Sequence, residues 1–275
     1  MEFHKKYRPI IADPFLLDQT YQNMTPSPEI KQYIRCFWGS AVNFNPHTSH
    51  CYQNRLLNPD TCNDLIFIKN VDTGRYKMLF TGLADTSTID IWAEEDKNIS
   101  LFGIRFHFWS MHCMIKMPMR NTLNNVIDPQ NMFPSISELC ERIFEAESFK
   151  VRVIIAETYF AGFLYEQKGT DTFLNAIDFM IKNHGLGTLT ELSEHVCYSK
   201  RHVQRMMQEA VGIAPKYLMN LIRYQSIWQE MVFSKNIDYM DLVHKYNYTD
   251  QSHFIADFKK YHSTTPKEAL KRIVF

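Results

Sequence analysis

The stretch Ser199-Lys-Arg-His-Val-Gln-Arg-Met-Met-Gln-Glu-Ala210 decides the fold of this chain. At the helical spacing of about 100° per residue, its small and apolar residues share one face, namely Val203, Met206, Met207 and Ala210. Its long polar residues share the opposite face, namely Arg201, Gln204, Arg205 and Gln208. Arginine and glutamine side chains read guanine and adenine in the DNA major groove. The stretch is therefore either a DNA-reading helix or an ordinary solvated helix, and the flanking sequence decides between the two.

A second short helix is predicted directly before this stretch. Thr188 and Glu191 have the spacing of a capping box, in which each side chain bonds the other residue's backbone N–H. Apolar residues follow at helical spacing through residue 196, and Cys197-Tyr198-Ser199 forms a short turn in which Ser199 is the expected N-cap. Two short helices joined by a tight turn are the layout of a helix-turn-helix unit.

The same layout occurs a second time. A long helix is predicted over residues 216–233, followed by a short amphipathic helix near residues 239–246. A turn at residues 247–249 leads into another helix over residues 250–261. Ala214-Pro215 closes the first unit and Thr265-Pro266 closes the second. This internal repeat is the strongest structural indication in the sequence.

Two helix-turn-helix units joined by one long helix resemble the DNA-binding domain of AraC/XylS-type transcription regulators. The matching motifs run through most of residues 188–272 and include Ser199-Lys-Arg-His-Val-Gln-Arg205, Gly212-Ile-Ala-Pro215, Ile222-Arg223, Asp250-Gln-Ser-His-Phe254 and Thr264-Thr-Pro266. Two positions depart from the family pattern. Asn247-Tyr248 stands where the family usually has Gly-Phe, and Ser263 stands where it usually has Gly. Asn tolerates the left-handed backbone conformation, so we expect the turn to be kept.

The resemblance implies that both reading helices enter consecutive major grooves of double-stranded DNA. In the first helix the predicted DNA-binding residues are Ser199, Lys200, Arg201, Gln204, Arg205 and Gln208. In the second helix they are Gln251, Ser252, His253, Ala256, Lys259 and Lys260. The first set can read bases, whereas the second mostly offers small and phosphate-binding groups. We therefore predict that the first unit carries most of the specificity and that the second mainly fixes position.

The N-terminal half has the sequence pattern of a β-sheet protein. Strands are predicted over residues 32–42, 64–69, 75–81 and 99–108, followed by helices over 137–144 and 151–165, the former after a capping box at Ser135 and Glu138. The predicted fold class is α+β: a β-rich, cupin-like domain with trailing helices over residues 1–168, then an all-α domain over 169–275. The boundary is set at the polar break 167–170.

The N-terminal half resembles, more weakly, the β-rich sensing domains of such regulators. The matching stretches are Asn63-Asp-Leu-Ile-Phe67, Phe80-Thr-Gly82 and Phe102-Gly-Ile-Arg-Phe106. The resemblance implies an effector pocket, a dimer surface, or both. The candidate effector-binding residues are Trp38, Trp92, Arg105 and Trp109. Arg105 could hold an anionic effector or form a structural ion pair, and the tryptophans could line a pocket or belong to the core. The helices over 137–144 and 151–165 could pair two subunits or pack on the sheet.

Length, charge and cysteine content limit the classes of protein to which this chain can belong. The chain has 275 residues, 45% of them hydrophobic, and a formal net charge of zero, which argues against a general polyanion binder. It has no apolar run long enough for a transmembrane helix, and its N-terminus lacks the apolar core of a secretory signal. The six cysteines form no Cys-x-x-Cys pair, so we expect free thiols in a cytoplasmic protein without membrane association.

Metal and enzyme signatures are weak. His47 with His50 and Cys51, and His107 with His112 and Cys113, lack the spacing of a metal site, so no metal or cofactor is predicted. The glycine, serine and histidine motifs of common enzymes are missing from the sequence. We therefore predict a non-enzymatic, sequence-specific DNA-binding regulator, controlled by a small-molecule effector or by homodimerisation. The resemblance favours an activator that contacts RNA polymerase. The alternative is a metal- or thiol-dependent enzyme or redox sensor fused to a DNA-binding domain.

Overall fold

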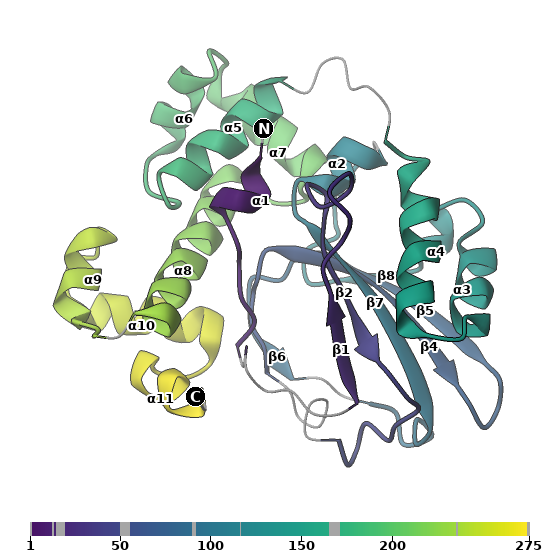
Figure 1. The fold of residues 1–275 in the computed structure, drawn as a ribbon. Coiled ribbons are helices and arrows are strands. Elements are labelled where there is room, and N and C mark those ends of the chain that lie inside the picture. Colours follow the sequence, from purple (N-terminus) through teal and green to yellow (C-terminus); the bar gives the residue numbers. More distant parts are fainter. Residues whose placement is uncertain are drawn as a thin grey trace.

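The computed structural model consists of a β-sheet part and a helical part that pack against each other (Figure 1). It describes residues 2–12, 14, 20–49, 56–89, 92–115, 117–164, 171–234 and 236–273. Among these residues, helices are too short or too polar to cross a membrane. The predicted α+β fold is confirmed, with the strands in the N-terminal part and helices alone after residue 171.

The centre of the N-terminal part is an antiparallel sheet of six strands in the order β1-β2-β7-β4-β5-β8. These strands are β1 (Tyr21–Met24), β2 (Ile34–Ser40), β4 (Cys62–Asn70), β5 (Tyr76–Thr81), β7 (Ile99–His107) and β8 (Val126–Ile127). A separate pair is formed by β3 (Leu56–Leu57) and β6 (Thr88–Ile89). Each of the four predicted strands is present, with ends shifted by at most two residues.

Alternating residues of β7 divide the sheet into two faces. Phe102, Ile104 and Phe106 are fully buried on the face that is covered by α3 (Ile136–Glu145) and α4 (Phe149–Ala161), seen beside the sheet in Figure 1. Ile99 and Leu101 belong to a smaller cluster on the opposite face. Because successive side chains of a strand point to opposite sides, the observed division follows directly from the alternation in the sequence.

The two trailing helices differ from the prediction in their first turns. Ser135 has a left-handed backbone (φ 54°) and its side chain makes no capping bond, so the predicted capping box at this position is wrong. A left-handed residue directs its side chain away from the N–H groups it would have to cap. The second helix begins at Phe149, two residues earlier than expected, because Ser148 caps it by accepting the N–H of Val151.

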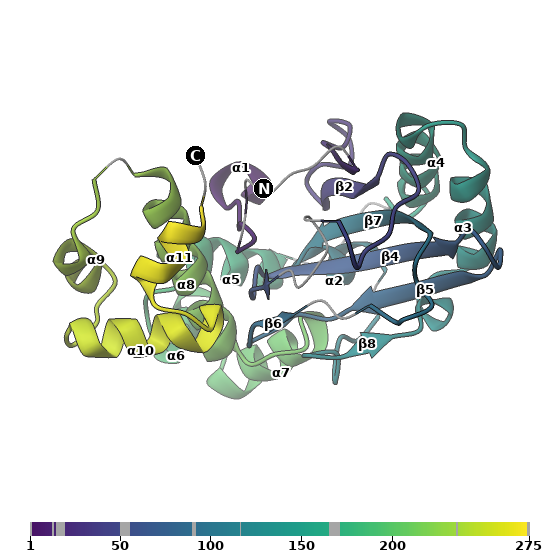
Figure 2. The same cartoon turned by 90° about the horizontal axis from the view of Figure 1, so that it is seen from below.

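The helical part contains seven helices within its described residues (Figure 2). They are α5 (Asp171–Lys182), α6 (Leu189–His195), α7 (Lys200–Ala210), α8 (Pro215–Phe233), α9 (Tyr239–Lys245), α10 (Gln251–His262) and α11 (Pro266–Arg272). Both predicted helix pairs are present, α6 with α7 and α9 with α10, and α8 joins them.

Local capping explains where these helices begin. The capping box of Thr188 and Glu191 is complete, and Ser199 accepts the N–H of His202 at the start of α7. Asp250 caps α10 in the same way. Asn247 and Ser263 both adopt left-handed backbones, with φ of 55° and 59°. The departures from the family pattern therefore keep the turns, although Ser263 bears the strain that glycine avoids.

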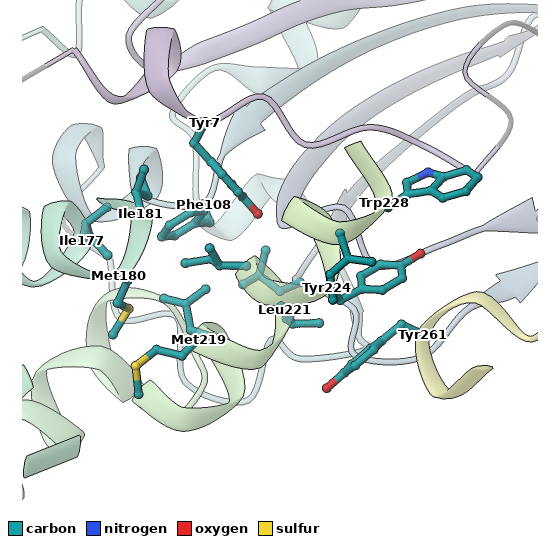
Figure 3. Close-up of a cluster of buried hydrophobic side chains, with 14 of the residues drawn as sticks. Tyr7, Phe108, Ile177, Met180, Ile181, Met219, Leu221, Tyr224, Trp228 and Tyr261 are labelled. Atoms are coloured by element: carbon teal, nitrogen blue, oxygen red, sulfur yellow. The ribbon is translucent and has the colours of Figure 1, made fainter. Parts of the chain in front are cut away.

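The two parts share a hydrophobic core. Tyr7 and Phe108 from the N-terminal part lie among side chains of α5 and α8, including Ile181, Leu221 and Tyr224 (Figure 3). The short helix α1 (Phe3–Lys6) contributes Phe3 to the same cluster, and α2 (Ser110–Met114) contributes Cys113. The predicted domain boundary at 167–170 lies outside the described residues.

A buried hydrogen-bond network reinforces this shared core. The Gln225 side chain is fully buried and accepts the N–H of Ile10 at 2.9 Å. Its amide nitrogen donates to the carbonyl oxygens of Ile10 at 3.1 Å and Pro59 at 2.7 Å. Nearby, the Asn58 amide donates to the Tyr224 hydroxyl at 2.8 Å, and that hydroxyl lies 2.7 Å from Nδ1 of His262. Ile10 is thereby fixed to α8, and Tyr224 of α8 connects Asn58 to the end of α10.

A second contact joins the N-terminal part to the end of α7. The N–H of Met119 donates to the carbonyl oxygen of Glu209 at 2.7 Å, and Arg120 pairs with the Glu209 carboxylate. Gly212 has φ +84°, and a Cβ on it would lie 2.3 Å from the Met119 carbonyl oxygen. Only glycine combines this backbone conformation with such a close approach.

Candidate DNA-binding surface

Helix α7 has the amphipathic division that the sequence predicts. Val203, Met207 and Ala210 are fully buried in the helical core. The predicted contact residues near the start of the helix are exposed on the other side, namely Lys200, Arg201, Gln204 and Arg205. Because one face is fixed by packing and the first turn by the Ser199 cap, these long side chains project from a rigid backbone. We call these four residues the α7 reading face.

Gln208 differs from the α7 reading face. Its side chain is half-buried, and its amide nitrogen donates to the carbonyl oxygen of Gly212 at 2.7 Å. This bond satisfies a carbonyl just beyond the helix end and holds Gln208 away from the exposed residues. A DNA contact by Gln208 stays a prediction.

The sequence analysis missed one residue beside the α7 reading face. Tyr198, which is 46% exposed, stacks on the ring of His202 with centroids 4.5 Å apart. It lies one position before the N-cap Ser199, at the end of the helix that carries Lys200 and Arg201. Its position directly before the predicted N-cap Ser199 was the sequence signal that could have drawn attention to this aromatic residue.

Helix α10 presents the second predicted set. All six predicted residues are exposed: Gln251, Ser252, His253, Ala256, Lys259 and Lys260. Phe254 and Phe258 are buried on the opposite side. The Lys260 ammonium lies 4.9 Å from the ring centroid of Tyr261 and 5.9 Å from that of Tyr217, which places its charge near the start of α8.

The length of α8 is close to the separation of the two DNA grooves. It has 19 residues, which at 1.5 Å per residue corresponds to about 28 Å. Successive major grooves on one face of DNA lie about 34 Å apart. The short turns at both ends of α8 add to its span, and the placement of α7 and α10 in adjacent grooves stays a prediction.

Two parts of the chain match known protein-family models. Residues 192–272 match the family model of a helix-turn-helix domain. These residues form an AraC-type helix-turn-helix domain. Residues 22–128 match a domain of unknown function (DUF6597), which covers the strands of the large sheet from part of β1 through β8. A search of curated proteins found no match to the chain.

The solved structures that resemble the chain are distant. The C-terminal domain of the two-component response regulator YesN from Fusobacterium nucleatum shares 20% identity, with a TM-score of 0.34 over 36% of this chain and 98% of that one. ToxT from Vibrio cholerae shares 11% identity, with a TM-score of 0.43 over 93% of this chain and all of that one. ToxT with a bound unsaturated fatty acid shares 10% identity, with a TM-score of 0.39 over 93% of this chain and 95% of that one.

Of the four candidate effector residues, Trp38, Trp92 and Arg105 share one face of the sheet, whereas Trp109 lies in the core between the two parts. Arg105 pairs with Asp64 through two hydrogen bonds of 2.9 and 2.8 Å and with Asp60 at 2.9 Å. The Trp38 indole N–H donates to the same Asp64 carboxylate at 3.0 Å. This arrangement fits the structural ion pair that the sequence left open, and effector binding by Arg105 stays a prediction.

The other two tryptophans belong to different clusters. Trp109 is buried in the core shared by the two parts, where its indole N–H donates to the carbonyl oxygen of Gln32 at 2.8 Å. Trp92 packs, like Trp38, on the cluster that contains Ile99 and Leu101, and by strand alternation this is the face of the sheet to which Arg105 belongs. A surface hollow of 210 Å³ is lined by Asn45, His47, Glu94 and Lys97, and none of the candidate effector residues lines it.

Several thiols are buried, and within the described part of the chain the histidines and thiols form no metal-binding cluster. Burial raises the pKa of the Cys113 and Cys140 thiols to about 12 and that of Cys62 well above its usual range. These thiols stay protonated at neutral pH and are poor nucleophiles. His, Cys, Asp and Glu residues with described positions form no group of three that could hold a metal ion. Two members of one weak sequence cluster, His50 and Cys51, lie outside the described residues.

Proposed function

We propose that this protein is a transcription regulator that binds a specific DNA site through its AraC-type domain. The observation that carries the proposal is the α7 reading face, with two arginines and one glutamine exposed on a helix whose other face is buried in the core. In this arrangement Arg201, Gln204 and Arg205 contact base edges, and α10 occupies the neighbouring groove.

A selection of binding sites from random double-stranded DNA tests this proposal. The selected sequences should contain two short half-sites about one helical turn apart. Arg205→Ala should then weaken binding by roughly 1–3 kcal/mol and relax the base preference at one position. Lys182→Ala, which removes an exposed basic residue of α5, is the matched control. Equal loss on selected and scrambled DNA would contradict base reading by α7.

We assign a different share of binding to α10. Lys259 and Lys260 are exposed cations that suit phosphate oxygens better than base edges. Lys259→Ala should weaken binding to all DNA sequences by a similar factor and reduce the slope of log affinity against log salt by about one. A sequence-dependent loss would assign base reading to this residue instead.

The N-terminal part, in this proposal, regulates the AraC-type domain in response to a small molecule. Support comes from the buried network around Gln225, because a change in the N-terminal part alters contacts made directly with α8. A ligand that binds the folded protein raises its melting temperature as its concentration increases. Screening small anions and fatty acids by thermal shift, with Arg105→Met as the comparison, tests the predicted role of Arg105. Reporter transcription with purified RNA polymerase decides between activation and repression.

We also propose that α4 pairs two copies of the chain. Ile154 is 53% exposed and Val151 38% exposed, one turn apart on the outer side of this helix. A second copy would bury both side chains. Light scattering should show a dimer for the wild type and a monomer for Ile154→Lys. A monomeric wild type at micromolar concentration would contradict this part of the proposal.

A further inference from the structure

A cluster of three side chains connects α8 to the second reading helix. Arg223 of α8 donates to the Asp257 carboxylate of α10 at 2.8 Å. Tyr248, in the turn before α10, donates its hydroxyl to the same carboxylate oxygen at 2.7 Å. The Arg223 guanidinium lies over the Tyr248 ring, 4.3 Å from its centroid. Each of the three residues therefore contacts the other two.

The cluster is largely withdrawn from solvent. Tyr248 is only 7% exposed, and the side chains of Arg223 and Asp257 are 15% and 17% exposed. Burial raises the pKa of Tyr248 above its ordinary value, so its hydroxyl keeps the proton that it donates to Asp257. Hydrogen bonds to charged groups are stronger than neutral ones when water is largely excluded. The cluster therefore has a defined geometry rather than that of a mobile surface ion pair.

The same ring contacts the exposed start of α10. The Tyr248 ring meets the His253 ring edge-on, with centroids 5.2 Å apart, and it packs against buried Phe254 in a similar way. His253 lies one helical turn before Asp257, so the two residues share a side of α10. Fixing both positions sets the rotation of α10 about its own axis.

The cluster also removes an electrostatic penalty. Asp257 is a negative charge on a helix that, in the proposed function, lies in a groove between phosphates. The Arg223 guanidinium compensates this charge at 2.8 Å, and the Tyr248 hydroxyl donates a hydrogen bond to the same carboxylate oxygen. Without these partners the carboxylate would repel the DNA backbone.

We propose that Arg223, Tyr248 and Asp257 are positioning residues that set the orientation of α10 for DNA reading. The inference rests on the proposed function and adds to it a set of residues that act without touching DNA. The hydroxyl of Tyr248 is the distinctive element, because the resemblance leads us to expect phenylalanine at this position.

The test uses the full chain and DNA selected with the wild-type protein. Tyr248→Phe removes a single hydroxyl and should weaken binding roughly tenfold, the equivalent of one hydrogen bond to a charged group. Arg223→Lys keeps the charge but loses the planar contact with the ring, and it should have a similar effect. Hydroxyl-radical footprints of both variants should lose protection at the half-site read by α10 and keep it at the half-site read by α7.

The ion pair of exposed Lys245 and half-buried Glu230 provides a control. It also joins the second helix-turn-helix unit to α8, at 2.7 Å, but it involves α9 rather than α10. Lys245→Met should leave both footprints unchanged. If Tyr248→Phe and Arg223→Lys bind with wild-type affinity and footprint, the positioning role is overturned. A general weakening at both half-sites would also overturn it, whereas a wild type without specific binding would overturn the proposed function itself.

Discussion

Replacing Gln225 with leucine should separate the start of the chain from α8. Leucine has a similar volume, so the change removes hydrogen bonds with little loss of packing. The N–H of Ile10 and the carbonyl oxygen of Pro59 would lose their Gln225 partner, whereas the Ile10 carbonyl would keep a longer bond of 3.4 Å from Asn58.

The expected magnitude follows from these two groups. A buried backbone group without a partner costs about 1–3 kcal/mol. Two such groups give a loss of roughly 2–4 kcal/mol after local relaxation, which corresponds to a fall in melting temperature of roughly 3–7 °C for a chain of this size. If the segment detaches instead, the same free energy appears as faster hydrogen exchange at residues 7–12.

Thermal unfolding and hydrogen exchange measured by mass spectrometry together cover both outcomes. Gln229→Leu is the matched control, because Gln229 lies one turn later on α8 and its side-chain amide donates to the Gln225 carbonyl oxygen, within the helix. Wild-type melting together with wild-type exchange in Gln225→Leu would refute the reasoning, since it would mean that the network contributes no stability.

Three further predictions follow from single features. Gly212→Ala should destabilise the protein by about 1–3 kcal/mol in urea unfolding, because the new Cβ would strike the Met119 carbonyl oxygen; Gly74→Ala, with φ +69° and open space around it, should cost less. Ser199→Ala should cost about 1 kcal/mol by uncapping α7 and should weaken DNA binding, whereas Ser148→Ala, which uncaps α4, should lower stability without affecting DNA. Burial lowers the pKa of His262 to about 4, below its unfolded value of about 6.5. The unfolded chain therefore binds the extra proton, and stability should fall by about 2 kcal/mol from this residue as the pH drops from 7 to 5. His262→Asn should show a smaller decrease in urea titrations at the two pH values, and an equal decrease would exclude His262 as the cause.

The helical repeat could be predicted because its signals are local. The capping box of Thr188 and Glu191 spans four residues, and the amphipathic pattern of α7 spans eleven. Each of these interactions forms within one helix and depends little on the rest of the fold. The failed capping box at Ser135 has the same sequence pattern, but there the chain enters the helix through a left-handed residue.

The contacts between distant residues could not be predicted in this way. Gln225 lies on the apolar stripe of α8, and its partner Ile10 is 215 positions earlier in the sequence. Nothing in the periodicity of either segment indicates the pairing. Arg105 likewise has an acidic partner on the neighbouring strand, but strand order is needed to place Asp64 beside it. The sequence therefore predicts the helices α7 and α10 better than the contacts that support them.

The attachment of the first residues to α8 also affects how the chain must be made. Ile10 leaves the ribosome long before Gln225, and at usual rates of synthesis the interval is roughly 10–40 s. During that time Phe3 and Tyr7 lack the helices that later cover them. The earliest part of the nascent chain is thus among the last to be buried, and a stalled or truncated product would expose it to chaperones and proteases.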